Sequence, residues 1–430
     1  MRIIELNESS RKKILENLLK RSPHQYETYN ETVAQIINDV RNNGDEALFL
    51  YTKKFDKVDI NADNIKVTDE ETEYAYKQVD PKLIDIIRKA KANIEEFHIK
   101  QKQNSWIDAS KEGIILGQKI TPIEKVGVYV PGGKAAYPST VLMDIIPAKV
   151  AGVKRIVMVT PPDKDGRVNP GTLVAAKEAG VTEIYKVGGA QAIAALAFGT
   201  ESIPKVDKIV GPGNIYVALA KKAVYGYVSI DSIAGPSEIL VLADETANPR
   251  YVAADLLSQA EHDELASSIL ITTSRNLADK VLEEIENFLK TLSRSDIIKK
   301  SLANYGYILI AKNMNEAIEA TNEIASEHLE IMTKDPYSDM TKIKNAGAIF
   351  IGEYSCEPLG DYMAGPNHTL PTNGTARFFS PLSVDDFVKK SSIISYNKDA
   401  LEKIYKDIET FALSEGLSAH ANSVSVRFNN

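Results

Sequence analysis

The feature that most constrains the fold is an alternation of apolar strand patterns and helical patterns that begins at Val126. The short runs VGVYV, RIVMVT, EIYKV and DKIV each lead into Gly or Pro and then into a helical pattern that ends in glycine. Glycine tolerates the left-handed backbone that closes a helix. The strand runs are apolar throughout, which is typical of strands buried on both faces. The alternation therefore predicts an α/β fold with a parallel, Rossmann-like sheet.

A second set of strand patterns follows Ser237: EILVLAD, SSILITT, GYILIA and AGAIFIG. Helical patterns separate them, and the last of these helices is expected to run through the SEHL segment. A chain of 430 residues also exceeds what one hydrophobic core usually serves. We predict four parts: a helical N-terminal region that packs on the second α/β unit (1–125), a first α/β domain (126–236), a second α/β domain with an active-site loop (237–380) and a C-terminal helical tail (381–430).

The strand and helix patterns lapse between Tyr354 and Pro381. A structureless run of this length inside a compact protein is either disordered or functional. This segment contains Tyr, Phe, Met, Leu and His side chains, which are too apolar for a mobile linker. We interpret it as a functional loop.

Composition excludes several classes of protein. The net charge is -8 and no basic stripe is concentrated anywhere, which argues against a nucleic-acid partner. No apolar run is long enough for a membrane span. The first residues lack the apolar core of a signal peptide, and the single cysteine, Cys356, allows no internal disulfide. A cytoplasmic protein without a membrane partner is expected.

Three glycine-rich turns follow strands in the first α/β set: YVPGGKAAYPST, KVGGAQAIAA and IVGPGNIYVA. Such turns expose backbone N–H groups at a helix N-terminus, where an anion can bind. None matches the GxGxxG fingerprint with its downstream acidic residue. The turns are compatible with a dinucleotide and equally with simple tight connections between strand and helix.

Two short motifs contain candidate ligands or proton carriers. SQAEH places Gln259 and His262 three residues apart, on one face of a helix, although glutamine is an uncommon zinc ligand. SEH pairs Glu327 with His328 at the expected end of a helix. A carboxylate and an imidazole suit proton transfer in two steps. Each motif alone is also compatible with an ordinary helix surface.

Further polar candidates lie in the long loop and the tail. GDY contains Asp361, GPNHTLPT contains His368, and SEGLSAHANSV contains Glu415 and His420. Spacing alone does not bring these segments together, because they are too far apart for a local metal motif. The residues by themselves predict an α/β enzyme with a possible site of His and carboxylate groups.

The same segments resemble the histidinol dehydrogenase family. The resemblance covers the chain nearly end to end, and its most specific pieces are VGGAQAIAALAFGTESIPKVDKIVGPGN, AGPSEILVLAD, LLSQAEHD, SEHLEI, GDYMAGPNHTLPT and EGLSAHANSV. It implies an NAD-dependent, zinc-containing enzyme that oxidises L-histidinol through L-histidinaldehyde to L-histidine, the last steps of histidine biosynthesis.

The resemblance also assigns roles to residues. It implies zinc ligands at Gln259, His262, Asp361 and His420, and acid–base catalysis by Glu327 and His328. It implies NAD contacts at Tyr129, Gln191 and Asn214, and places His368 in the same pocket. Besides the zinc ligands and His328, it implies substrate contacts at Ser237 and Glu415. It further implies an intertwined homodimer in which the tail completes the partner's site.

Cys356 departs from the family pattern, which usually has Pro in this segment. It lies five residues before Asp361, where it resembles an aldehyde-trapping nucleophile. The family oxidises its aldehyde without a catalytic thiol, so we interpret Cys356 as a small apolar bystander.

Two other functions compete with this one. A zinc hydrolase would use Glu327 or Glu261 as a base toward metal-bound water and would need no NAD. A non-catalytic nucleotide-binding protein would have no use for Glu327, His328 and the four metal positions. The nitrogen and oxygen ligands are also compatible with Mn or Co in place of zinc.

Overall fold

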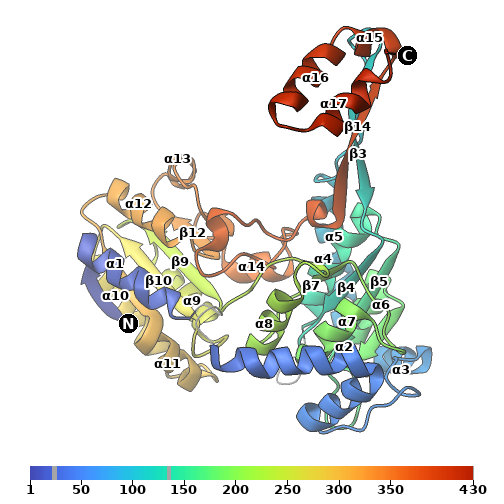
Figure 1. The fold of residues 1–430 in the computed structure, drawn as a ribbon. Coiled ribbons are helices and arrows are strands. Elements are labelled where there is room, and N and C mark those ends of the chain that lie inside the picture. Colours follow the sequence, from blue (N-terminus) through green and yellow to red (C-terminus); the bar gives the residue numbers. More distant parts are fainter. Residues whose placement is uncertain (22–26, 133–136, 430) are drawn as a thin grey trace. The chain divides into compact units, whose positions relative to one another are not determined.

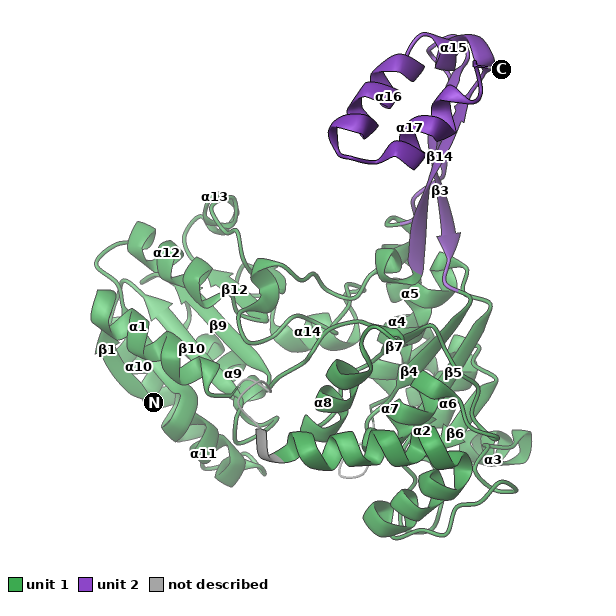
Figure 2. Ribbon diagram, in the orientation of Figure 1, with its two compact units in different colours: residues 1–101, 124–387 green, residues 102–123, 388–430 purple. Residues whose placement is uncertain are grey.

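The computed structural model describes residues 1–21, 27–132 and 137–429. It divides into two compact units, one of residues 1–101 and 124–387 and one of residues 102–123 and 388–430 (Figure 2). The larger unit contains two parallel sheets with helices packed against them (Figure 1). The predicted α/β class and the two Rossmann-like sheets are confirmed.

The first sheet has the strand order β6-β5-β4-β7-β8, and all its strand pairs are parallel. Its strands are β4 (Lys125–Tyr129), β5 (Arg155–Thr160), β6 (Glu183–Lys186), β7 (Lys208–Val210) and β8 (Ser229–Ile230). Its connecting helices are α5 (Pro138–Ala151), α6 (Pro170–Ala179), α7 (Gly189–Phe198) and α8 (Ile215–Val224). The four glycines expected to close these helices all have positive φ, as that role requires.

The second sheet has the order β1-β11-β10-β9-β12-β13 and is also parallel throughout. Its strands are β1 (Arg2–Glu5), β9 (Glu238–Ala243), β10 (Ser267–Thr272), β11 (Gly306–Ile310), β12 (His328–Met332) and β13 (Ala348–Ile351). The helices of this region are α9 (Pro249–Ala260), α10 (Arg275–Phe288), α11 (Ser295–Tyr305), α12 (Met314–Ile324), α13 (Pro336–Met340) and α14 (Glu357–Tyr362). Two 3₁₀ turns follow, at Thr375–Arg377 and Val384–Phe387.

The N-terminal region divides between the two sheets. It comprises β1, α1 (Glu8–Leu19), α2 (Glu27–Asp56), α3 (Asp69–Gln78) and α4 (Pro81–Ile99). β1 pairs with β11, and α1 buries Ile14 and Leu18 in a core of the second sheet. By contrast, α2 buries Val33, Ile36 and Val40 in the core of the first sheet, and α4 packs on α5. The prediction that the whole region packs on the second α/β unit is therefore correct only for β1 and α1, because α2 to α4 carry apolar stripes that match helices of the first sheet.

The long segment predicted to lack regular structure contains α14, a short helix with Pro358 in its first turn. Proline suits the first turn of a helix because the N–H it lacks has no intrahelical partner there. The rest of the segment packs on the larger unit through buried residues such as Asn367 and Leu370. Part of this segment is therefore packed into the larger unit, whereas Tyr354 and Phe378 are strongly exposed.

The smaller unit is a three-stranded antiparallel sheet followed by helices. It contains β2 (Trp106–Asp108), β3 (Ile114–Pro122), β14 (Val388–Tyr396), α15 (Lys398–Glu402), α16 (Tyr405–Ser414) and α17 (Ser418–Ser425). The predicted helical tail is present from Lys398 on, but it is preceded by β14, which pairs along its whole length with β3. That partner is distant in sequence, so local periodicity gives no sign of it.

Candidate active site

Both glycine turns that follow β4 and β7 lie at the same edge of the first sheet. These strands are neighbours at the centre of the sheet, where the chain order reverses. In open parallel sheets, ligands bind outside the carboxyl ends of the strands at this switch point. Tyr129 ends β4, and Gly211 directly follows β7. The topology therefore places Tyr129 and the turn that leads to Asn214 at the point where a doubly wound fold binds its ligand.

Tyr129 and Gln191 are both buried at this edge. The Tyr129 hydroxyl accepts a hydrogen bond from the Gly189 N–H at 3.2 Å, and burial raises the pKa of this tyrosine to about 12. Gln191 is in the first turn of α7 and is only 1 % exposed, yet neither atom of its amide has a partner among the described residues. Leaving a buried amide unpaired is costly. A ligand that pairs with Gln191 would remove that cost.

Asn214 is the N-cap of α8. Its side-chain oxygen accepts hydrogen bonds from the N–H groups of Tyr216 and Val217. The preceding turn is held in place because the Gly211 N–H donates to Asp231 and the Lys221 ammonium donates to the Gly211 carbonyl. Asn214 therefore shapes the turn, and its direct contact with a nucleotide stays a prediction.

Glu327 and His328 do not lie at the end of a helix, as the sequence pattern suggests. Helix α12 ends at Ile324, and Ala325 has left-handed backbone that breaks the helix. His328 is the first residue of β12, between β9 and β13. The reason is burial: Leu329, Ile331 and Met332 fill a core on the second sheet, which only a strand at this position can do. The pair thus lies at the amino edge of the second sheet.

The main chain of Glu238 contacts both of these residues. The imidazole Nδ1–H of His328 donates to the Glu238 carbonyl at 2.9 Å. The Glu238 N–H donates to Oε2 of Glu327 at 2.8 Å. Because Nδ1 carries the proton, Nε2 of His328 is the basic nitrogen, and this buried atom has no partner among the described residues. This arrangement presents an unprotonated imidazole nitrogen ready to accept a proton.

Burial sets the charge of the pair. It lowers the pKa of His328 and therefore favours the neutral imidazole. It raises the pKa of Glu327 well above the ordinary value, and the nearby carboxylates of Glu238, Glu357 and Asp361 raise it further. The raised pKa means that the Glu327 carboxyl holds its proton more firmly than an exposed glutamate does. The site therefore contains two groups suited to acid–base chemistry.

A second cluster of polar groups lies at the end of α9 and on α14. The ligand atoms of His262, Glu357 and Asp361 lie within 4.8 Å of one another. Gln259 is buried on α9, and its Oε1 has no hydrogen-bond partner among the described residues. Imidazole nitrogen and carboxylate oxygen are ordinary zinc donors. The structure thus brings together two of the four predicted ligands, His262 and Asp361, with Glu357 as a third group that could bind a cation.

Glu357 is a member of this cluster that the sequence analysis missed. Its Oε1 lies 3.8 Å from Nε2 of His262, and its Oε2 accepts a hydrogen bond from the Ser258 hydroxyl at 2.6 Å. Its own N–H donates to Glu330, a buried carboxylate on β12. The available signal was spacing, because Glu357 and Asp361 lie four residues apart and therefore share a face of α14.

Asp361 connects this cluster to the cavity beside His328. A cavity of about 560 Å³ is lined by His328, Asp361, His368 and Phe350, among others. A smaller cavity of about 380 Å³ is lined by His262 and again by Asp361. His368 donates from Nδ1 to the Asp361 carbonyl, and its Nε2 lies 3.3 Å from the Thr140 hydroxyl. The predicted place of His368 beside the site agrees with these contacts.

Ser237 directly precedes β9 and is half-buried one residue from Glu238. Glu415 and His420 belong to the smaller unit, where both are exposed. There they line one depression of about 900 Å³ together with Phe411 and Leu417 from α16 and the turn that follows it. The structure groups these two residues with each other, and their contribution to a zinc site stays a prediction.

Known proteins resemble this chain along nearly its whole length. The family model "Histidinol dehydrogenase" matches residues 19–428. The histidinol dehydrogenase of Clostridium acetobutylicum is 58 % identical over 428 residues, covering 100 % of this chain and 99 % of the relative. That of Caldanaerobacter subterraneus subsp. tengcongensis is 58 % identical over 417 residues, covering 97 % and 96 %.

A solved structure leads to the same assignment. The crystal structure of histidinol dehydrogenase from Elizabethkingia anophelis matches with a TM-score of 0.93 and 43 % sequence identity, covering 99 % of this chain and 98 % of that one. The chain therefore belongs to the histidinol dehydrogenase family.

Proposed function

We propose that this chain oxidises L-histidinol through L-histidinaldehyde to L-histidine with NAD, which are the last steps of histidine biosynthesis. The observation that carries the proposal is the fixed imidazole of His328. Its Nδ1 is held by Glu238 and its buried Nε2 is unpaired, beside Glu327 and a cavity that Asp361 also lines. Membership of the family supplies the substrate.

We propose that NAD binds at the carboxyl edge of the first sheet. Tyr129, Gln191 and Asn214 lie on the three segments that form this edge, and the unpaired amide of Gln191 is the strongest support for a ligand there. The first turn of α7 begins at glycine and has no side-chain cap; its Gly189 N–H donates to Tyr129, and the N–H groups that follow it lie at a helix N-terminus of the kind that binds an anion. NAD, when bound, supplies the hydride acceptor for both oxidations.

We propose that Gln259, His262 and Asp361 hold a zinc ion, with His420 as the fourth ligand. The unpaired Oε1 of Gln259 and the proximity of His262 to Asp361 support this set. When bound, zinc would hold the imidazole and amino nitrogens of the substrate and so orient its alcohol carbon. Glu357, beside His262, is suited to orienting that imidazole, as carboxylates commonly do for metal-binding histidines.

In the first oxidation, Nε2 of His328 accepts the hydroxyl proton of histidinol as the hydride leaves the carbon for NAD. The carbonyl of Glu238 keeps the Nδ1 proton in place, so the same imidazole nitrogen is available again after the proton is released. Retention of the aldehyde in the cavity that His328 and Asp361 line would limit its loss to solvent.

In the second oxidation, Glu327 accepts a proton from the water that adds to the aldehyde carbon. The raised pKa of Glu327 makes the carboxylate a stronger base than an exposed glutamate, which suits this task. His328 accepts a proton from the resulting hydrate as a second hydride leaves for a second NAD. Each substrate molecule therefore yields two NADH.

We propose that the chain acts as a homodimer whose tail completes the site of the partner. The support is an exposed apolar surface on the smaller unit around Glu415 and His420, with Phe411 68 % exposed and Leu413 54 % exposed. Such a surface marks a site of protein contact. Mixing the inactive variants His262→Ala and His420→Ala should restore about a quarter of the wild-type activity, because half of the dimers regain one intact site. Absence of recovery after subunit exchange would contradict a shared site.

Among residues 1–21, 27–132 and 137–429, no helix is long and apolar enough to cross a membrane. We propose a cytoplasmic enzyme, in line with its single cysteine and its biosynthetic family.

The assay that tests the function is NADH absorbance on adding limiting L-histidinol to the zinc-loaded protein with excess NAD. Two NADH per histidinol are expected. One NADH would contradict the second oxidation, and none would favour a hydrolase or a non-catalytic nucleotide-binding protein.

A further inference from the structure

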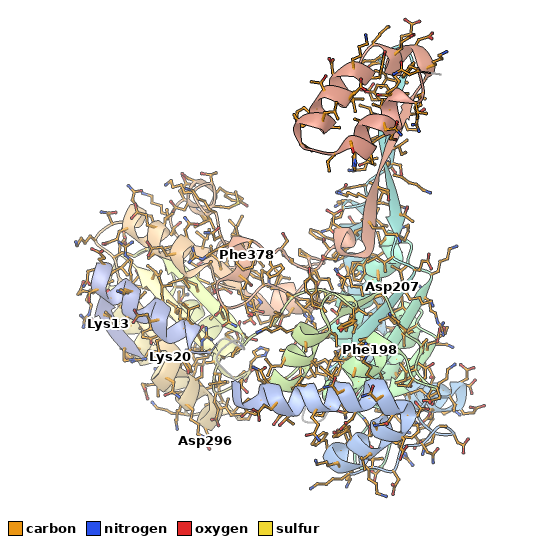
Figure 3. All side chains as sticks on the ribbon, in the orientation of Figure 1. Lys13, Lys20, Phe198, Asp207, Asp296 and Phe378 are labelled. Atoms are coloured by element: carbon orange, nitrogen blue, oxygen red, sulfur yellow. The ribbon has the colours of Figure 1, made fainter. Side chains whose placement is uncertain are left out.

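A buried ion pair joins the end of α1 to the start of β9. Arg21 is fully buried, and its Nη2 lies 2.5 Å from Oε1 of Glu238, which is also buried. Figure 3 places Lys20, the residue before Arg21, at the end of α1. The pair thus links a segment near the N-terminus to the central strand of the second sheet.

Arg21 is fixed in this position by three other groups. Its Nε donates to the Leu18 carbonyl, and its Nη1 donates to the Leu265 carbonyl at 2.9 Å. Its guanidinium carbon lies 5.2 Å from the ring centre of Tyr305. A guanidinium with its donors used in this way has one orientation, and it holds the Glu238 carboxylate through Oε1.

Glu238 is the residue whose main chain contacts both Glu327 and His328. Its N–H donates to Glu327 and its carbonyl accepts from His328, at 2.8 and 2.9 Å. It is also the first residue of β9, next to the irregular segment that ends at Ser237. The end of a strand is the place where its hydrogen bonds open most readily. A tether on the Glu238 side chain therefore limits movement of the two atoms that hold the acid–base pair.

We propose that the Arg21–Glu238 ion pair is a positioning device for Glu327 and His328, beyond its part in folding. Arg21 and Glu238 act through the main chain of Glu238 and do not touch the substrate. The proposal rests on the roles that the proposed function gives to Glu327 and His328. It explains why a charged pair is present in a core where apolar side chains of similar size would stabilise the fold at least as well.

The test compares neutral replacements of the pair in the full-length, zinc-loaded protein. The single variants Arg21→Met and Glu238→Gln each leave one buried charge without its partner, so they are expected to lose thermal stability. The double variant Arg21→Met/Glu238→Gln removes both charges and should recover most of that stability. Because the orienting pair is absent, its kcat should remain about 10- to 100-fold below wild type, since small misplacements of reacting groups cost this much.

Three readouts separate positioning from a structural role. The KM for histidinol and the zinc bound per chain should stay within about twofold of wild type, because the substrate and metal groups are unchanged. The ¹⁵N spectrum of labelled histidine should show His328 protonated at Nδ1 in the wild type and as a mixture of tautomers in the double variant. The conservative variant Arg21→Lys should retain part of the kcat that Arg21→Met loses.

The matched control is Arg155→Met/Glu183→Gln, which removes another arginine–glutamate pair, one that joins β5 to β6 in the first sheet. Its kcat should equal that of wild type. A folded double variant at Arg21 and Glu238 with wild-type kcat and a single His328 tautomer would overturn the proposal. The proposal would also be overturned if the kcat of this double variant, expressed per zinc-bound site, equalled that of wild type.

Failure of the proposed function has a different outcome. If His328→Asn and Glu327→Gln retained full kcat, the acid–base roles themselves would be wrong. If those variants lost activity while the double variant kept it, only the positioning role of Arg21 and Glu238 would be contradicted.

Discussion

The two parallel sheets share one strand order, yet the residues of the proposed site lie at opposite edges of them. Each sheet contains five strands of one α/β set. Numbered along the chain, they lie in the order third, second, first, fourth, fifth, and the second sheet has β1 as an additional edge strand. The first sheet presents Tyr129 and the Gly211 turn at its carboxyl edge. The second presents Glu238 and His328 at its amino edge, where α9 also returns with Gln259. The strand order therefore fixes the point at which the order of connection reverses. The loops determine which edge of each sheet holds the residues of the proposed site.

The difference matches the task of each edge. The carboxyl edge of the first sheet presents glycine turns and an open helix N-terminus, which suit the recognition of an anionic cofactor by backbone N–H groups. The amino edge of the second sheet holds side chains by strand hydrogen bonds, as it does for His328. Acid–base groups require one fixed tautomer and one orientation, which a central strand supplies. The comparison implies that binding and catalysis can be impaired separately.

The largest expected effect is at the amino edge of the second sheet. His328→Asn removes the nitrogen that accepts the substrate proton, so kcat should fall about a thousandfold. The affinity for NAD, measured by fluorescence titration, should not change, because the residues proposed to bind NAD lie on the first sheet. A kcat within tenfold of wild type would remove His328 from the chemistry.

A smaller effect is expected at the metal cluster. Glu357→Gln keeps the size of the side chain and removes the charge that faces His262, so zinc should bind about 10- to 100-fold more weakly in competition with a chelator. Cys356→Ala is the matched control, because Cys356 immediately precedes Glu357 and its side chain makes no capping hydrogen bond. Equal zinc affinity in the two variants would show that Glu357 does not support His262. The control also tests the interpretation that Cys356 is not a nucleophile. If that is correct, the kcat of Cys356→Ala should equal that of wild type.

At the carboxyl edge of the first sheet the effect should fall on binding. Gln191→Leu removes an unpaired buried amide, so the KM for NAD should rise about tenfold, the usual worth of one or two hydrogen bonds. Bound zinc and the KM for histidinol should stay as in wild type. If Gln191→Leu lost zinc while its KM for NAD stayed as in wild type, the proposed separation of NAD binding at the first sheet from metal binding and catalysis at the second would be contradicted.

The smallest effect concerns pH. Burial lowers the pKa of His328 below the ordinary value of 6.5, so the imidazole loses its proton at a lower pH than an exposed histidine. Because the unprotonated form accepts the substrate proton, kcat/KM should remain near its maximum at pH 6.5 and decline only at lower pH. Buffered initial-rate measurements would check this, and a decline beginning above pH 6.5 would mean that His328 is not the group that titrates.

The sequence predicted the parts of the fold that local patterns encode. Strands β4 to β7, and β9, β10, β11 and β13, follow from apolar runs between turns, and the α/β class follows from them. β12 was missed because Glu330 interrupts its apolar run and the preceding helical pattern extends toward it. Inside the strand Glu330 is buried and accepts the Glu357 N–H, a contact with a residue 27 positions away. β1 and β14 were missed because each pairs with a strand far along the chain.

The candidate site likewise has some features that local sequence patterns predict and others that depend on contacts between distant segments. The types and spacing of Gln259 and His262 were visible on one helix, and the structure places Asp361 and Glu357 beside His262 from a separate helix. Glu357 escaped notice because a single glutamate in a loop has no pattern of its own. The role of the Glu238 main chain could not be predicted, because it depends on the alignment of β9 with β12. Local pattern reveals candidate ligands, and tertiary contacts decide which of them act together.

The most direct test of the account is the zinc content of His262→Ala, measured by elemental analysis beside wild type and Cys356→Ala. The account predicts about one zinc per chain in the wild type and in Cys356→Ala, and almost none in His262→Ala, because the imidazole is a central ligand of the cluster. An unchanged zinc content in His262→Ala would contradict the assigned metal site and, with it, the chemistry placed at the amino edge of the second sheet.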